Sequence, residues 1–92
     1  MHGMIKRLKE LVTASGQPLP GMPIVELAGN KRVLIENHLG ITEYENERIG
    51  ILVKYGKLIV TGEALEICCL SGQQLVITGK IDGILVERGH TQ

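Results

Sequence analysis

The amino-acid sequence predicts an all-β fold, a small antiparallel meander of about six to seven short strands with a sandwich or barrel-like form. From Ile24 onward, short apolar triplets rich in β-branched residues recur, and glycines or polar clusters separate them at the spacing of a strand plus a turn. With 92 residues, the chain has the size of one domain. The triplets are Val33-Leu34-Ile35, Ile51-Leu52-Val53, Leu58-Ile59-Val60, Ile67-Cys68-Cys69, Leu75-Val76-Ile77 and Ile84-Leu85-Val86.

The residues before the first predicted strand have a different pattern. Met4–Ala14 places apolar side chains at helical spacing among charged ones, which predicts one short amphipathic helix. A helix of this length is marginal alone in water, so we expect it to dock on the sheet or to fray. Ser15–Pro23 contains three prolines and two glycines, as linkers do. The predicted organisation is a helix and linker at residues 1–22, a β domain at 23–89 and a tail at 90–92.

One hairpin can be predicted to the residue. Tyr55-Gly56 lies between two apolar triplets, and a two-residue turn that ends in glycine is typical of a primed turn. We therefore expect Gly56 to adopt a positive φ. Because side chains alternate along a strand, the resulting register places four apolar side chains on one face and two on the other. The predicted pairs are Lys54 with Lys57, Val53 with Leu58, Leu52 with Ile59, Ile51 with Val60 and Gly50 with Thr61.

The second half of the chain contains an internal similarity. Leu58–Gly72 matches Leu75–Gly89 at a constant offset, from Leu-Ile-Val-Thr-Gly against Leu-Val-Ile-Thr-Gly to a closing glycine. This pattern predicts two similar hairpin units, and the alternative is turns of a short β-solenoid. The predicted hairpin favours antiparallel pairing.

Both faces of the predicted sheet are apolar, because the middle residue of each triplet is apolar as well. Burial of one Leu or Ile side chain is worth roughly 1.5–3 kcal/mol, so we expect a cover over the second face. The cover is either a second layer of the same chain, the N-terminal helix, or another subunit. We predict a protein-contact surface at the six middle residues, Leu34, Leu52, Ile59, Cys68, Val76 and Leu85.

Composition argues against several functions. Ten Lys and Arg balance ten Asp and Glu, and the two aromatic residues, Tyr44 and Tyr55, are too few to stack bases. Two cysteines make no disulfide framework, and no stretch approaches the roughly 20 apolar residues that span a bilayer. We therefore expect a cytoplasmic protein with no nucleic-acid partner and no membrane span of its own.

The sequence holds no catalytic motif: no nucleotide-binding glycine fingerprint, no Walker loop and no nucleophile elbow. We expect no enzyme activity, no cofactor and no metal. Cys68 and Cys69 are adjacent, whereas catalytic dithiols use a C-x-x-C spacing. Since neighbours on a strand point to opposite faces, we expect these two thiols to differ in exposure. Asp82 precedes Gly83 as a turn or bulge residue does.

Glu36 and His38 supply the alternative function. They lie two residues apart, so they can share a face and offer two metal ligands. A structural zinc site takes about four ligands. The alternative is a small ligand- or metal-sensing domain that uses these two residues, whereas the simpler interpretation is a strand that leads into a turn.

Three stretches carry a family resemblance: Ile35-Glu36-Asn37-His38-Leu39-Gly40-Ile41 followed by Tyr44, then Leu58-Ile59-Val60-Thr61-Gly62, and then Ile77-Thr78-Gly79-Lys80-Ile81 with Ile84. On these residues, the chain from about Pro23 to Val86 resembles the YabP/YqfC family of sporulation proteins, and its YqfC branch most. The first stretch is fairly specific, while the others would match many β proteins. The polar segment Glu87–Gln92 departs from the YqfC branch.

The resemblance implies a protein made during spore formation in endospore-forming bacteria, cytoplasmic in the mother cell and peripheral to a membrane through a partner. YqfC-like proteins are typically encoded beside a membrane-associated sporulation protein of the YqfD type. The family supplies no catalytic residues to carry over. We therefore predict a non-enzymatic structural or adaptor module that forms homo-oligomers, binds a YqfD-type partner, or does both.

Overall fold

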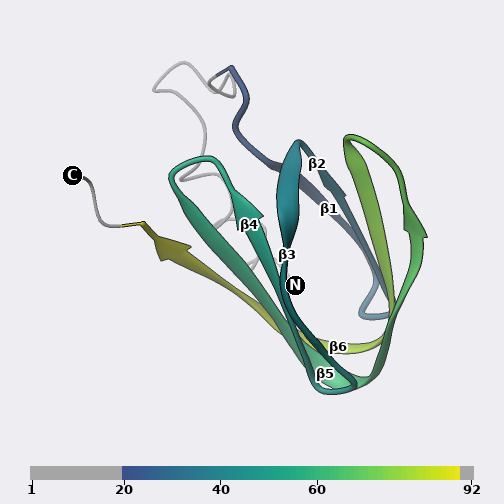
Figure 1. Ribbon diagram of the computed structural model, residues 1–92. Helices are drawn as coiled ribbons and strands as arrows, with labels where there is room; N and C mark the ends of the chain where they lie inside the picture. Colours follow the sequence, from purple (N-terminus) through teal and green to yellow (C-terminus); the bar gives the residue numbers. More distant parts are fainter. Residues whose placement is uncertain (1–19, 90–92) are drawn as a thin grey trace.

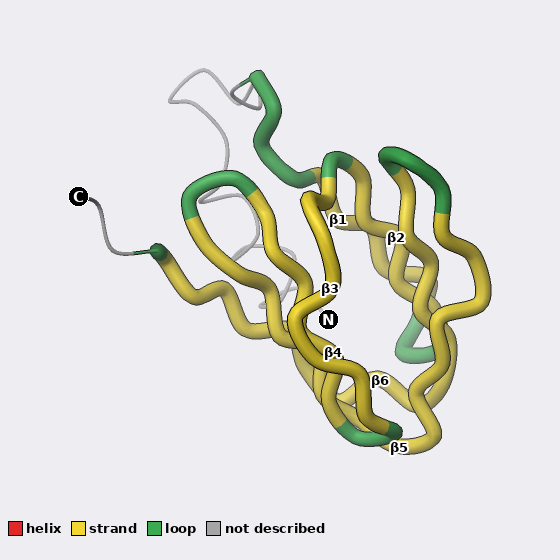
Figure 2. The backbone as a smooth tube through the Cα atoms, in the orientation of Figure 1, coloured by secondary structure: helices red, strands yellow, loops and turns green. Residues whose placement is uncertain are grey.

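The computed structural model describes residues 20–89, which form six β-strands and no helix. All six strands belong to one sheet, and all neighbours in it are antiparallel. The all-β antiparallel class is confirmed. The solenoid alternative is wrong for this part of the chain, because the rungs of a β-solenoid pair in parallel. Figures 1 and 2 show the strands β1 (Ile24–Ala28), β2 (Arg32–Glu36), β3 (His38–Glu45), β4 (Arg48–Val53), β5 (Gly56–Leu70) and β6 (Gln74–Arg88).

The strands lie in the order β1-β2-β6-β5-β4-β3. From β3 to β6 the chain is a meander, as predicted, but β2 pairs with β6, so the chain crosses the sheet between β2 and β3. Asn37 alone separates those two strands. Strands β6, β5 and β4 lie between β2 and β3 in the sheet order. The sheet therefore curls so that one residue can join β2 to β3 (Figure 1). It stays open, because β1 and β3 are not hydrogen-bonded to each other.

Strands β5 and β6 contain 15 residues each, so the prediction of short strands is wrong for both. Each of them holds two of the apolar triplets. The similarity between Leu58–Gly72 and Leu75–Gly89 is therefore a similarity between the two partners of one long hairpin, and not between two hairpin units.

The long hairpin bends where its register is irregular. Asp82 has no partner on β5, since Thr61 pairs with Gly83 and Gly62 pairs with Ile81. Of the two alternatives predicted for Asp82, a turn or a bulge, the structure shows the bulge. A bulge bends its strand and increases the local twist, so the hairpin folds the sheet on itself. The further irregularities lie between Glu63 and Glu66 and between Ile67 and Cys69.

The bend in the β5–β6 hairpin divides the sheet into two halves, which diverge from the bend in Figure 1. The β4 half consists of β3, β4, the start of β5 and the end of β6, whereas the β2 half consists of β1, β2, the start of β6 and the end of β5. The β1–β2 turn and the β3–β4 turn are each hydrogen-bonded to the backbone of the bent β5–β6 hairpin. These bonds are Gly62 N to Glu47 O (3.1 Å), Leu65 N to Asn46 O (2.8 Å), Gly79 N to Lys31 O (3.2 Å) and Ile81 N to Asn30 O (2.7 Å).

The hydrophobic core lies between the two halves. Every residue that the predicted hairpin placed on the core face is buried, and the outer residues of the first triplet are buried with them. The described core contains no buried charged or polar side chain. Its members are Val33, Ile35, Ile49, Ile51, Val53, Leu58, Val60, Leu65, Leu75, Ile77, Ile81 and Ile84.

The β4–β5 hairpin forms, but its predicted register is wrong. Val53 pairs with Gly56 and Ile51 pairs with Leu58, so the two turn residues are Lys54 and Tyr55. Every partner is shifted by two residues along β5. Because side chains alternate with a period of two, an even shift keeps each side chain on its predicted face. The core residues of this hairpin could therefore be predicted correctly from an incorrect register.

The prediction of a positive φ at Gly56 is also wrong, since the positive φ belongs to Tyr55 (70°). Gly56 is constrained by a close approach of the backbone instead. A Cβ atom at this position would lie 2.2 Å from the carbonyl oxygen of Glu87 and 3.0 Å from the backbone nitrogen of Gly89. A side chain at Gly56 would therefore separate β5 from the end of β6.

Asn37 forms the corner at which the chain leaves β2 and enters β3. It has a φ of 67°, in the left-handed region that asparagine tolerates better than most residues. Its backbone N–H donates to the carbonyl of Gln73 (2.8 Å), and its side-chain amide donates to the carbonyl of Met22 (3.0 Å). The Ile35–Ile41 stretch is thus the segment in which the chain passes from β2, on one half of the sheet, to β3, on the other half.

We expect Asn37→Val to destabilise the protein more than Asn37→Gly. Glycine keeps the left-handed conformation and loses only the side-chain hydrogen bond, worth about 0.5–1.5 kcal/mol, whereas valine adds backbone strain of about 1–3 kcal/mol. Chemical denaturation of the two variants measures the difference. Equal free energies of unfolding would show that the corner imposes no conformational requirement.

The predicted helix at Met4–Ala14 lies outside the described residues, as does most of the linker. Pro20, within the described part, accepts a hydrogen bond from Lys54 Nζ through its carbonyl oxygen (3.0 Å). This contact holds the approach to β1 beside the β4–β5 turn.

Candidate protein-binding surface

Three of the six predicted contact residues come together on the outer face of the β4 half. Ile59 on β5 pairs with Leu85 on β6, and its partner Gly50 on β4 lies two residues from Leu52, so Leu52 is its diagonal neighbour on the same face. Their neighbours in sequence on either side point into the core. We call Leu52, Ile59 and Leu85 the outer patch.

The members of the outer patch differ in exposure. Leu52 and Leu85 are 44% and 46% exposed, whereas Ile59 between them is 1% exposed. Two leucines are thus left partly in water on the same face of β4 and β6, the two strands that flank β5. Transfer of each remaining apolar surface out of water would be favourable, at roughly 25 cal/mol per Å². The outer patch can therefore gain free energy by binding an apolar surface.

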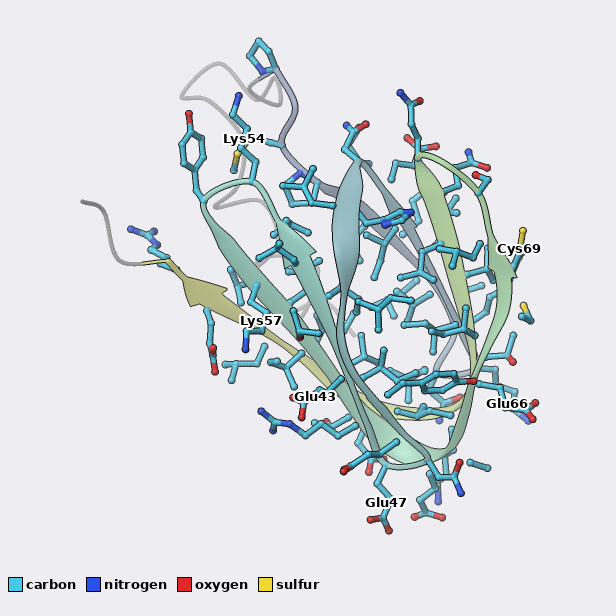
Figure 3. All side chains as sticks on the ribbon, in the orientation of Figure 1. Glu43, Glu47, Lys54, Lys57, Glu66 and Cys69 are labelled. Carbon is cyan, nitrogen blue, oxygen red and sulfur yellow. The ribbon has the colours of Figure 1, made fainter. Side chains whose placement is uncertain are left out.

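Charged side chains surround the outer patch. Lys57 pairs with Leu52 on one side and with Glu87 on the other, so it contributes a cation next to an anion at the edge of the patch. On the neighbouring β3–β4 ladder, Arg48 Nε donates to Glu43 Oε1 at 2.7 Å, and this hydrogen bond together with the carboxylate charge raises the pKa of Arg48. Figure 3 shows Glu43 and Lys57 on this half of the sheet and Cys69 on the other.

The other three predicted contact residues lie on the β2 half. Leu34 pairs with Val76, and Val76 pairs with Cys69. Val76 is buried, Leu34 is half-buried and Cys68 is exposed. The bends in β5 and β6 separate this group from the outer patch. The structure therefore places the six residues in two groups on different halves of the folded sheet.

The prediction that the two cysteines differ in exposure is wrong, since both are exposed. Cys68 has no partner on β6, because Ile67 pairs with Ile77 and Cys69 pairs with Val76. A bulge breaks the strict alternation of side chains on which the prediction depended.

We expect a soluble disulfide reagent such as DTNB to modify both cysteines in the native protein at comparable rates. Each thiol is exposed in the folded chain, so neither needs an unfolding step before it reacts. Absorbance of the released thiolate counts the reactive groups, and the denatured protein supplies the control. Modification of a single cysteine in the native protein would contradict the bulge.

Glu36 and His38 flank the Asn37 corner, and each is bound to the β5–β6 turn region. Glu36 Oε2 accepts a hydrogen bond from Gln74 Nε2 (3.1 Å), and His38 Nε2 lies 3.0 Å from the carbonyl oxygen of Ser71. A carbonyl only accepts, so Nε2 carries a proton in this hydrogen bond. Nδ1 is buried without a hydrogen-bond partner. Residues 20–89 contain no group of three or more His, Cys, Asp or Glu side chains that could hold a metal ion.

Sequence reasoning missed two exposed leucines and one tyrosine. Leu39 (63% exposed) lies at a register irregularity of β3, and Leu70 (55% exposed) ends β5, so simple alternation identifies neither. Tyr44 on β3 accepts a hydrogen bond from the backbone N–H of Ile67 through its hydroxyl (2.9 Å), which links β3 to the end of β5. Within the described residues, no helix has the length and apolarity needed to cross a membrane.

Comparison with known proteins gives one family and one curated relative. The model of the YabP family matches residues 22–92. The uncharacterized protein YqfC of Bacillus subtilis (strain 168) is 25% identical over 61 residues, which cover 66% of this chain and 66% of the relative. The matched region thus spans just under two-thirds of that relative's length. No solved structure matches the chain.

Proposed function

Since the chain belongs to the YabP family, we propose that it is a non-enzymatic structural or adaptor module of endospore formation that binds other proteins. Its partners are a second copy of the chain, a membrane-associated sporulation protein, or both. The family resemblance supports the process, and the similarity to YqfC agrees with the predicted branch.

The observation that supports binding is the outer patch. Leu52 and Leu85 are about half exposed on the same face and surround the buried Ile59. Their core-facing neighbours already supply a hydrophobic core, so the fold leaves the exposed leucines available. An apolar centre with Lys57, Glu87 and other charges at its rim is the arrangement of a protein interface.

The partner we propose for the outer patch is a membrane-associated protein of the YqfD type. The chain would then work in the cytoplasm of the mother cell and reach the membrane through that partner. Leucines that dock on an apolar surface would supply affinity, and the rim charges would select the partner.

Binding to a YqfD-type protein in lipid nanodiscs, measured by surface plasmon resonance, tests this function. Leu52→Glu should weaken binding by roughly tenfold or more, the effect of losing a central interface contact of about 1.4 kcal/mol. Leu70→Glu is the matched control, because Leu70 is a similarly exposed leucine outside the outer patch. Equal affinities of both variants and the wild type, or no binding by the wild type, would contradict the proposal.

A second candidate is metal or small-ligand sensing at Glu36 and His38, which one observation favours. The Nδ1 atom of His38 is buried and has no hydrogen-bond partner. Isothermal titration calorimetry with zinc, carried out on the wild type and on His38→Ala, tests this candidate. Zinc binding that His38→Ala abolishes would support sensing, and equal behaviour of the two proteins would exclude a role for this imidazole.

A further inference from the structure

The last part of β6 has one unpaired edge within residues 20–89. Gly83–Arg88 pairs with β5 on one side, but β2 pairs only with Gln74–Thr78, at the other end of the strand. Figure 1 shows the end of β6 at the outer margin of the β4 half. In an antiparallel strand, every second residue directs its N–H and C=O away from the paired neighbour. This edge therefore offers backbone donors and acceptors.

Other edges of the sheet carry features that discourage pairing. Strand β3 has two register irregularities, one on each side of Gly40–Ile41. The end of β5 has the bulge at Cys68, and the hydroxyl of Tyr44 accepts the N–H of Ile67. Bulges and covered edges prevent sheets from adding further strands. The Gly83–Arg88 segment has neither a bulge nor a proline, and it pairs with β5 in a regular register.

We propose that a second copy of the chain adds to this edge, so that the two β6 strands pair antiparallel about a two-fold axis at Leu85. This inference deepens the proposed function, because it specifies how the module self-associates. A two-fold axis at Leu85 places apolar residues opposite apolar residues and brings opposite charges together. The opposed residues are Leu85 with Leu85, Ile84 with Val86, Gly83 with Glu87, and Asp82 with Arg88.

The sequence at the edge favours this register over its neighbours. An axis at Val86 would set Ile84 against Arg88, and an axis at Ile84 would set Asp82 against Val86. Strand β1, whose outer edge also lacks a bulge, is a poorer candidate, since a central two-fold axis there would set Glu26 against Glu26. Like charges directly opposite each other destabilise a sheet.

Edge pairing would leave the outer face uncovered. Leu85 lies on that face beside Ile59, so the outer patches of the two copies would meet at the two-fold axis. Val86, half-buried at the margin of the core, would gain Ile84 of the other copy as a neighbour. The dimer would thus present one apolar surface with two-fold symmetry to a partner.

Disulfide trapping tests the register. In a Cys68→Ser, Cys69→Ser background, Leu85→Cys should form a covalent dimer under mild oxidation. Its Cβ atoms would be about 4.5–5.5 Å apart, near the roughly 4 Å that a disulfide bridges. Glu87→Cys is the control, because the two Glu87 positions would lie about 13 Å apart at 3.3 Å per residue. A monomeric Leu85→Cys, or equal crosslinking by Glu87→Cys, would overturn the proposal.

Charge reversal tests the pairing without a crosslink. Asp82→Arg and Arg88→Asp should each weaken the dimer by roughly 2- to 30-fold, since two opposite-charge pairs become like-charge pairs. The double variant should restore it, as measured by sedimentation equilibrium. A double variant as weak as the singles would count against the register. Binding to the YqfD-type protein is measured separately, so a monomeric chain that still binds it would overturn the edge dimer and leave the proposed function intact.

Discussion

Ile59→Glu is expected to unfold the protein, whereas Leu52→Glu is expected to leave the monomer folded. Both residues lie in the outer patch, but Ile59 is 1% exposed and Leu52 is 44% exposed. A carboxylate at Ile59 would be buried without a partner, at a cost of several kcal/mol against a total stability of about 5–15 kcal/mol. A carboxylate at Leu52 reaches water, so we expect a change below about 1 kcal/mol.

Circular dichroism during thermal denaturation, combined with light scattering, distinguishes these outcomes. Leu52→Glu should keep the β spectrum and a cooperative transition, and Ile59→Glu should lose both. A folded Ile59→Glu would mean that the outer face of the β4 half accommodates a charge at its centre. An unfolded Leu52→Glu would mean that this leucine belongs to the core.

Gly62→Val is expected to destabilise the fold by about 3 kcal/mol or more, as backbone clashes in an element interior do. A Cβ atom at Gly62 would lie 2.0 Å from the carbonyl oxygen of Lys80, and this oxygen belongs to the opposite backbone of the bent hairpin. The N–H of Gly62 also donates to the carbonyl of Glu47, which attaches the β3–β4 turn to the bend.

Gly72→Val supplies the matched control for Gly62→Val. Gly72 lies in the β5–β6 turn, and nothing lies within 4 Å of the position that its Cβ would take. Urea denaturation should show a large fall in the midpoint for Gly62→Val and a small change for Gly72→Val. Equal midpoints would contradict the close approach of the two strands at the bend.

The core could be predicted from the sequence because alternation survives errors of register. The β4–β5 pairing was predicted two residues away from its true partners, and Ile51, Val53, Leu58 and Val60 still lie on the core face. Burial depends on the face of a strand, and a shift of two residues does not change the face. The predicted core face of the hairpin is correct for this reason.

The long strands could not be predicted from the same pattern. Thr61-Gly62 and Ser71-Gly72 both resemble turn signals, but only the second lies in a turn. At Gly62 the glycine instead allows the backbone of Lys80 to approach. A local pattern does not distinguish a turn from a bend inside a paired strand, because both favour glycine.

The fold brings the six predicted contact residues together in two separate groups, and not on one surface. Alternation placed Leu34, Val76 and Cys68 on a second face together with the outer patch, but it carried no information on the bends that separate the two groups. The free edge of β6 also escaped sequence reasoning. Identifying an edge requires the order of the strands, and that order depends on the crossing at Asn37, a single residue with a left-handed backbone.

The most direct test of binding through the outer patch is an NMR titration of the methyl-labelled protein with the YqfD-type partner in nanodiscs. The methyl resonances of Leu52, Ile59 and Leu85 should shift or broaden as partner is added. Those of Leu39 and Leu70, which are as exposed or more so, should remain in place. Changes confined to Leu39 and Leu70, or a spectrum unchanged at saturating partner, would contradict binding through the outer patch.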